Sequence, residues 1–194
     1  MIKQAKFVTS VANKNNILDV QAPEIAFAGR SNVGKSSLLN FLCNQNKLAK
    51  TSSEPGRTRL INYFEINQGE YYFVDLPGYG FAKAPKGEKE KWGDLMEGYF
   101  QLSKNLRNVF LLVDIRHKPT EDDKMMIHYM YYYNIQFTII ATKADKLSRM
   151  QQQKQVKIIA DELKVGTGNI YVASAQNKVG KEQILARIDQ ILEG

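Results

Sequence analysis

The chain has 194 residues, the length of one ordinary domain, and 43% of them are hydrophobic, which excludes a disordered tail. Basic residues number 27 against 20 acidic ones, and this net charge of +7 favours either a polyanionic partner or a solvated basic surface. The N-terminus has no continuous apolar segment, and the longest apolar run near the middle, residues 109–113, is too short for a membrane span. A lone cysteine, Cys43, fits a reducing cytoplasm.

From residue 24 onward, short β-rich runs alternate with segments of helical periodicity, which is typical of an α/β sheet. The predicted strands are residues 25–28, 60–66, 71–74, 109–115, 137–141 and 170–173. The predicted helices are residues 35–45, 92–106, 120–133, 148–163 and 181–192. Residues 47–59 and 77–91 show no convincing period and are predicted to be loops, which at this length are usually functional.

A phosphate-binding motif follows the first predicted strand. The sequence matches G-x-x-x-x-G-K-[ST] at Gly29, Arg30, Ser31, Asn32, Val33, Gly34, Lys35 and Ser36. Backbone N–H groups of such a loop, together with the helix N-terminus, point at phosphate oxygens. Lys35 would place a positive charge on the β- and γ-phosphates, and the Ser36 hydroxyl would be a ligand for Mg²⁺. The alternative is a glycine turn beside a surface lysine, and the flanking strand and helix argue against it.

A second motif indicates which base is bound. The residues Thr142, Lys143, Ala144 and Asp145 follow a predicted strand and resemble the guanine-recognition pattern [NT]-K-x-D. An ionised Asp145 can accept hydrogen bonds from both N1–H and the 2-amino group of guanine, whereas adenine lacks this pair of donors. The alternative is a capped helix start. The last predicted strand is followed by Ala173, Ser174 and Ala175, a loop of the kind that presents a backbone N–H to guanine O6.

Two further segments are candidate switch elements. The D-x-x-G pattern is matched by Asp75, Leu76, Pro77 and Gly78, where Asp75 would reach Mg²⁺ through water and the Gly78 N–H would sense the γ-phosphate. Upstream lie Gly56, Arg57, Thr58, Arg59 and Leu60, and Thr58 is the candidate second hydroxyl ligand of Mg²⁺ in the GTP state. We therefore expect the catalytic groups to be Lys35, Thr58 and Gly78.

The five motifs in this order indicate an α/β, P-loop G domain with helices on both faces of a mostly parallel central sheet that has one antiparallel strand. We expect this single domain to span residues 23–194, with residues 1–22 as an N-terminal extension. The segments GRSNVGKSSL, TSSEPGRTR, DLPGYGFAK and ATKAD, together with residues 114–117, resemble the EngB (YihA/YsxC) family of bacterial ribosome-assembly GTPases over nearly the whole chain.

This resemblance implies a cytoplasmic switch that binds GTP or GDP with Mg²⁺ and acts in assembly of the large (50S) ribosomal subunit, with a link to cell division and septation. Its implied partners are rRNA and ribosomal proteins, and we expect a monomer without a membrane span. The candidate contacts to rRNA are the basic residues of the two predicted loops: Arg57, Arg59, Lys83, Lys86, Lys89 and Lys91. The rival functions are an adaptor without significant turnover and a P-loop small-molecule kinase.

Three residue roles have two interpretations each. Tyr79 follows D-x-x-G where Ras uses a glutamine to orient water, so we expect Tyr79 to pack the switch and intrinsic hydrolysis to be slow. Asn32 either shapes the phosphate loop or holds K⁺ near the phosphates, as in GTPases that resemble this motif. The tyrosines of residues 129–133 either stack on RNA bases or pack a helix end on the sheet, and packing is favoured.

Overall fold

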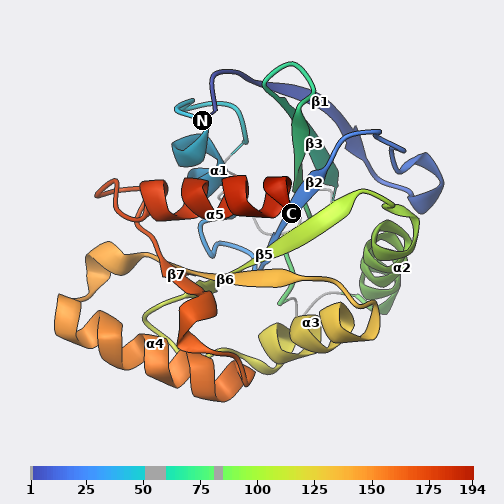
Figure 1. Cartoon of the computed structure of the whole chain (residues 1–194). Helices are drawn as coiled ribbons and strands as arrows, with labels where there is room; N and C mark the ends of the chain where they lie inside the picture. The colour runs from blue at the N-terminus through green and yellow to red at the C-terminus, as the bar shows by residue number, and fades with distance from the viewer. Residues whose placement is uncertain (1, 51–59, 81–84) are drawn as a thin grey trace.

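The computed structural model describes residues 2–50, 60–80 and 85–194, which form a seven-stranded sheet in the order β1-β3-β4-β2-β5-β6-β7 with helices on both faces (Figure 1). The strands are β1 (Ala5–Val11), β2 (Glu24–Gly29), β3 (Ile61–Ile66), β4 (Tyr71–Asp75), β5 (Leu106–Asp114), β6 (Phe137–Thr142) and β7 (Ile170–Val172). The helices are α1 (Lys35–Leu42), α2 (Lys86–Leu102), α3 (Glu121–Tyr132), α4 (Arg149–Leu163) and α5 (Lys181–Glu193). Among the described strands β3 alone runs opposite to the others: it pairs antiparallel with β1 and with β4, and the remaining pairings are parallel, which confirms the predicted fold class.

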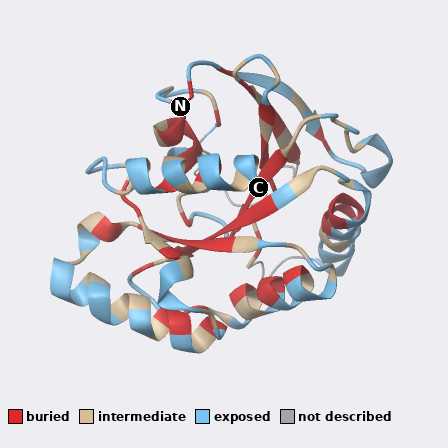
Figure 2. Ribbon diagram, in the orientation of Figure 1, coloured by how far each residue is buried: buried red, intermediate tan, exposed pale blue. Residues whose placement is uncertain are grey.

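Two apolar cores lie on opposite faces of the sheet. Along β5, Val109, Leu111 and Val113 join the core under α2, α3 and α4, whereas Phe110 and Leu112 join the core under α1 and α5. Because both faces of β5 are covered, its residues 109–113 form a continuous apolar run instead of an alternating pattern. The inner strands of the sheet are therefore the buried centre, whereas most of the edge strand β1 and the outer faces of the helices are exposed (Figure 2). Within the described ranges, no helix combines the length and the apolar character that crossing a bilayer requires.

The structure has a strand before the first one that the sequence predicts. β1 pairs with β3, from Ala5 opposite Ile66 to Val11 opposite Ile61, and so forms one edge of the sheet. A register shift between Phe7 and Thr9 breaks the alternation of this strand. The alternating pattern that identifies a half-buried strand is therefore missing, which explains why the sequence did not predict it.

Several predicted boundaries differ from the observed ones. α2 begins at Lys86 and ends at Leu102, whereas the prediction was 92–106, and β5 begins at Leu106 instead of residue 109. Residues 86–91 are all exposed, so the first turns of α2 carry no apolar period from which a helix could be predicted. α1 ends at Leu42, three residues before the predicted end, and Asn44 then adopts a left-handed backbone conformation. The other boundaries agree to within one residue.

A buried carboxyl group stands at the start of β2. Glu24 is 1% exposed, and the Tyr99 hydroxyl donates a hydrogen bond of 2.7 Å to its Oε2. Burial raises the pKa of Glu24, and the hydrogen bond from Tyr99 opposes this rise without cancelling it. Since the folded pKa lies above the unfolded one, folding favours the protonated carboxyl, and this stabilisation is lost as pH rises through the folded pKa.

Replacing Glu24 with Gln should therefore stabilise the protein at pH 8 and leave its stability unchanged at pH 4. Gln keeps an oxygen that can accept from Tyr99 but has no charge to desolvate. The measurement is the free energy of unfolding by urea at both pH values, with exposed Glu90→Gln as the control. A variant less stable than the wild type at both pH values would contradict the assignment.

Cys43 lies at the C-terminal end of α1 and is buried in the core beneath α1 and α5. Burial raises the pKa of its thiol to about 12, although the positive charge of Lys181 acts in the opposite direction. A thiol with this pKa stays protonated at neutral pH.

Candidate functional site

The phosphate loop connects the C-terminal end of β2 to the N-terminus of α1. Gly29 is required because a Cβ there would lie 2.8 Å from Val33 Cγ1 and 3.1 Å from the Leu112 carbonyl oxygen. Gly34, the residue before α1, has a φ of 105°, and Asn32 has a φ of 65°. These left-handed turns wrap the backbone in front of the helix N-terminus, an arrangement suited to binding an anion. The conformation of Asn32 fits the loop-shaping interpretation, and its binding of K⁺ stays a prediction.

Lys35 and Asp75 form an ion pair at the mouth of this loop. Lys35 Nζ contacts Asp75 Oδ1, and Asn62 Nδ2 donates to Asp75 Oδ2 at 3.4 Å. The side chains of Lys35 and Asp75 are 12% and 9% exposed. Ser36 follows Lys35 in α1. Its hydroxyl oxygen and the Asp75 carboxylate are hard oxygen ligands of the kind that Mg²⁺ prefers. In the described part of the chain no group of three His, Cys, Asp or Glu side chains could hold a metal, so phosphate oxygens and water would complete the coordination.

The D-x-x-G segment lies against the phosphate loop. The Ser31 N–H donates to the Tyr79 carbonyl at 2.9 Å, and the Tyr79 N–H donates to the Gly29 carbonyl at 3.2 Å. A Cβ on Gly78 would lie 3.0 Å from Ser31 Oγ, so a larger residue at this position would push the two segments apart. The strand ends of β2 and β4 therefore bring the two motifs together, although 41 residues separate Gly34 from Asp75.

Tyr79 packs inward, as predicted. Its hydroxyl donates a 2.6 Å hydrogen bond to Asp123 Oδ1, while Asp123 Oδ2 accepts from both the backbone N–H and the hydroxyl of Thr120 at the start of α3. The ring of Trp92 makes an edge contact with Tyr79, and Trp92 Nε1 donates to the Pro77 carbonyl. Burial and the neighbouring Asp123 raise the pKa of Tyr79 well above its usual value. The phenol is thus a neutral donor already engaged with protein.

A cavity of about 390 Å³, here called the base-side cavity, opens beside the phosphate loop. Its walls come from α1, β6 and the loops after β5, β6 and β7: Gly34, Ser37, Leu38, Arg116, Thr142, Lys143, Asp145, Lys146, Ala173, Ala175 and Gln176. Asp145 Oδ1 accepts a 2.7 Å hydrogen bond from Ser174 Oγ, and Oδ2 pairs with Lys146 Nζ at 3.1 Å. The hydrogen bond from Ser174 is the largest of the effects that lower the pKa of Asp145. An ionised, oriented carboxylate therefore faces a cavity that can hold a planar base.

The guanine motif is tied directly to the phosphate loop. The Thr142 hydroxyl lies 2.7 Å from the Val33 carbonyl oxygen and 3.1 Å from that of Val113. Lys143 has a φ of 61°, and its Nζ donates to the Asn32 carbonyl at 2.9 Å. The segment 173–175 is held by the N–H of Ala144, which donates to the Ala173 carbonyl at 3.1 Å. These contacts join three motifs that are distant in the sequence into one site.

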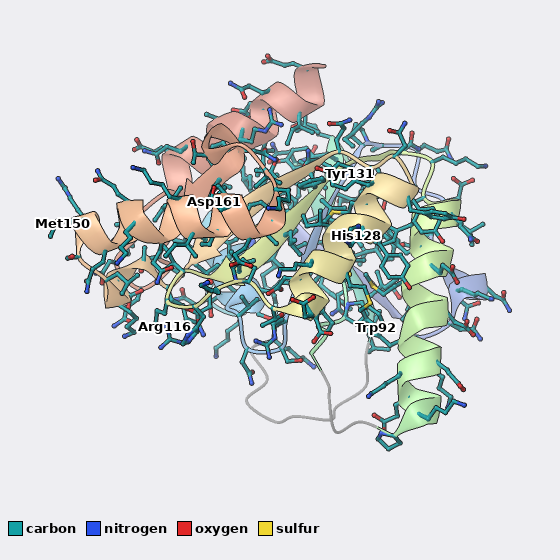
Figure 3. All side chains as sticks on the ribbon, turned by 90° about the horizontal axis from the view of Figure 1, so that it is seen from below. Trp92, Arg116, His128, Tyr131, Met150 and Asp161 are labelled. Carbon is teal, nitrogen blue, oxygen red and sulfur yellow. The ribbon has the colours of Figure 1, made fainter. Side chains whose placement is uncertain are left out.

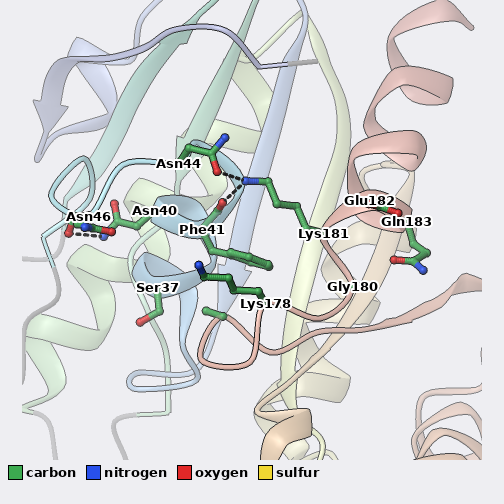
Figure 4. A pocket seen from close by; sticks show the side chains of 11 residues that line it. Ser37, Asn40, Phe41, Asn44, Asn46, Lys178, Gly180, Lys181, Glu182 and Gln183 are labelled. Carbon is green, nitrogen blue, oxygen red and sulfur yellow. Dashed lines mark hydrogen bonds between the residues drawn. The ribbon is translucent and has the colours of Figure 1, made fainter.

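A larger cavity of about 770 Å³ adjoins the first one between α1 and α5, and both cavities include Ser37 and Ala175 (Figure 4). Lys181 Nζ crosses from α5 to the end of α1, where it donates to the Phe41 carbonyl and to Asn44 Oδ1, each at 2.6 Å (Figure 4). Because Lys181 is the first residue of α5, this contact fixes the loop that leads from β7 past Ala175.

Other predicted site residues lie elsewhere or cannot be placed. Leu60 is half-buried just before β3, whereas four candidates fall outside the described residues: Gly56, Arg57, Thr58 and Arg59. Lys83 is outside them as well. Tyr129 and Tyr133 stack on each other at 6.4 Å, as expected for helix-end packing, but Tyr131 and Tyr132 are 60% and 81% exposed. Arg116, which lines the base-side cavity, was not predicted as a site residue. Its position within residues 114–117, one of the segments that resemble the EngB family, is the signal that could have indicated a role.

The sheet order, the phosphate loop between β2 and α1, and the base-side cavity define a P-loop GTPase domain. A family model described as "50S ribosome-binding GTPase" matches residues 24–143. A protein of Clostridium kluyveri described as "Probable GTP-binding protein EngB" is 50% identical over 99% of this chain and 98% of its own length. The chain therefore belongs to the EngB family of GTP-binding proteins.

Solved structures agree with this assignment. A crystal structure described as a probable GTP-binding protein EngB superposes with a TM-score of 0.71, at 26% identity over 88% of this chain and 98% of the other. The Y63A variant of Era from Aquifex aeolicus, bound to GDP and AlF₄⁻, superposes with a TM-score of 0.70 at 21% identity, covering 88% of this chain and 57% of that chain. The likeness to Era is one of fold.

Proposed function

We propose that this protein is a cytoplasmic molecular switch that binds GTP or GDP with Mg²⁺, hydrolyses GTP slowly, and acts in assembly of the 50S ribosomal subunit, through which it is needed for cell division and septation. The observation that carries the guanine assignment is Asp145, an oriented carboxylate held by Ser174 at the wall of the base-side cavity. Residues 29–36 would hold the phosphates, and the loop 173–175 would meet guanine O6. As the catalytic groups, Lys35 would contact the β- and γ-phosphates, the Gly78 N–H would sense the γ-phosphate, and Thr58 would bind Mg²⁺ when the γ-phosphate is present.

The proposed Mg²⁺ site uses the hydroxyls of Ser36 and Thr58, with Asp75 acting through water. When bound, the ion would neutralise charge that develops on the phosphates. Lys35 must exchange its contact with Asp75 for phosphate oxygens, which leaves the Asp75 carboxylate available to the hydration shell of the metal. Lys35, Ser36 and Asp75 lie at the same end of the sheet. Thr58 is outside the described residues.

Slow intrinsic turnover follows from Tyr79. Its buried phenol is committed to Asp123, so it offers no group to orient the attacking water. We expect a rate on the order of 10⁻³ s⁻¹ or lower for the protein alone, as for a switch without its activating partner. The measurement is phosphate release with and without 50S particles. Acceleration by the particles is expected, whereas no turnover in either condition would favour the adaptor, and transfer of phosphate to a small metabolite would favour the kinase.

A ribosomal partner is supported by the description of the family and by the basic charge of the chain. The net charge is +7, and α2 begins with Lys86, whose side chain is 92% exposed. The predicted loop 47–59 contributes Lys47, Lys50, Arg57 and Arg59 against one acid, Glu54. If GTP draws Thr58 onto Mg²⁺, the neighbouring cations acquire one fixed geometry that can match rRNA phosphates.

Affinity for 50S particles or their precursors should therefore be higher with GTP than with GDP and should fall steeply with salt. Co-sedimentation in a non-hydrolysable GTP analogue, in GDP and without nucleotide measures this difference. Reversing Arg57 and Arg59 to Glu should remove most of the GTP-dependent increment, once unchanged GTP binding has been verified. The control is Lys164→Glu, an exposed reversal just after α4. An affinity for these particles that changes neither with the bound nucleotide nor with the salt concentration would overturn the ribosomal assignment.

A further inference from the structure

A cluster of one carboxylate and two cations lies where β5 ends. Asp114 Oδ1 accepts from the Arg116 backbone N–H at 3.1 Å and from Arg116 Nε at 2.9 Å. Asp114 Oδ2 accepts from Arg116 Nη2 at 2.7 Å and pairs with Lys143 Nζ at 3.1 Å. The Asp114 carboxylate thus accepts from four donor groups, and the Arg116 guanidinium donates to both of its oxygens.

Lys143 connects this cluster to the nucleotide site. Its Nζ contacts Asp114 on β5 and the carbonyl of Asn32 in the phosphate loop, so one ammonium group joins β5, the end of β6 and that loop. Lys143 and Arg116 both line the base-side cavity. Figure 3 shows Arg116 at the surface, on the loop that leads from β5 to α3.

The electrostatics of the cluster favour its charged form. Burial alone would raise the pKa of Asp114, but the hydrogen bonds from Arg116 and the contact with Lys143 outweigh burial and lower it. Asp114 is therefore an anion at every physiological pH. A carboxylate held by a guanidinium fork has one orientation, whereas a lysine in place of Arg116 would supply charge without the two parallel bonds.

We propose that Arg116 is a positioning residue for guanine nucleotides: it holds Asp114 in the orientation that keeps Lys143 between β5 and the phosphate loop, as a wall of the base-side cavity. The proposal rests on the proposed function of that site. It assigns Arg116 no contact with the base, since its effect passes through Asp114 and Lys143. Loss of Arg116 would leave Lys143 free to leave the cavity wall.

The first test compares the binding of a fluorescent GDP derivative by full-length wild type, Arg116→Ala, Arg116→Lys and Asp114→Asn. Arg116→Ala and Asp114→Asn should each raise the dissociation constant by about tenfold, the size of one coupled interaction. Arg116→Lys should recover less than half of this loss on a logarithmic scale, because it lacks the fork. The matched control is Lys118→Ala, which removes an ion pair to Glu162 from the same loop and should bind as wild type does.

The second test is a double-mutant cycle with Lys143→Ala, titrated with nucleotide up to high concentration. If Arg116 acts through Lys143, then Arg116→Ala should change affinity less than about twofold in the Lys143→Ala background. Equal losses in both backgrounds would overturn the proposal, as would wild-type affinity in Arg116→Ala. Wild-type protein that fails to bind GDP would instead overturn the proposed function. Thermal unfolding of each variant without nucleotide verifies that it folds. If Arg116→Ala does not fold, Asp114→Asn and Arg116→Lys take its place in the cycle.

Discussion

Replacing Asp145 with Asn should lower the affinity for GDP by about 100-fold or more, because two charge-assisted hydrogen bonds to the base are lost. The same variant should gain affinity for XDP, since the Asn amide can donate to the 2-oxo group of xanthine. Ser174 can still donate to the remaining side-chain oxygen, so the residue should keep its orientation. Competition of GDP and XDP against a fluorescent nucleotide measures both constants.

The control for this exchange is Asp161→Asn. Asp161 lies exposed on α4, and the variant makes the same chemical change outside the base-side cavity (Figure 3). It should retain wild-type selectivity. If Asp145→Asn and the wild type do not differ in their affinities for GDP and XDP, Asp145 does not read the base.

Replacing Lys35 with Met should abolish measurable nucleotide binding and also destabilise the nucleotide-free protein. The second effect arises because Asp75 is nearly buried and loses its cation, which for a buried pair costs about 3 kcal/mol. Adding Asp75→Asn to Lys35→Met removes the unpaired charge and should restore most of the stability without restoring binding. Urea unfolding without nucleotide measures the stability, and titration with GDP measures the nucleotide binding.

Lys118→Met is the control, since it breaks an exposed pair with Glu162 and should cost less than about 1 kcal/mol. A single Lys35→Met variant as stable as the wild type would contradict the view that Lys35 compensates the Asp75 charge. Retained GDP affinity would contradict its contact with phosphate.

The residues of the candidate site could be proposed from the sequence because each of its motifs is a short, contiguous segment. Gly34 is favoured by its own left-handed backbone conformation, and Asp145 was predicted from the donors of guanine, so neither prediction needs a distant contact. Gly29 differs, because a Cβ there would also meet the distant Leu112 carbonyl oxygen. The convergence of the motifs follows from parallel strands, whose carboxyl ends meet at one edge of the sheet.

The contacts between motifs were not predictable in the same way. Nothing in the pattern around Asp114 indicates that it pairs with Lys143, which is 29 residues further along the chain. The contact of Tyr79 with Asp123 likewise depends on how α3 packs against the sheet. The first turns of α2 and the bulged β1 escaped prediction because neither has an apolar period.

The burial of Cys43 has a practical consequence for labelling the protein in solution. Its thiol is buried and stays protonated at neutral pH, and the sequence holds no other cysteine, so we expect alkylating reagents to react slowly with the native protein. A cysteine placed at Lys86, at the exposed start of α2, would be the single site for a fluorophore or spin label. The effect of added nucleotide on the start of α2 could then be followed by the signal of one probe, with no need to build a cysteine-free parent.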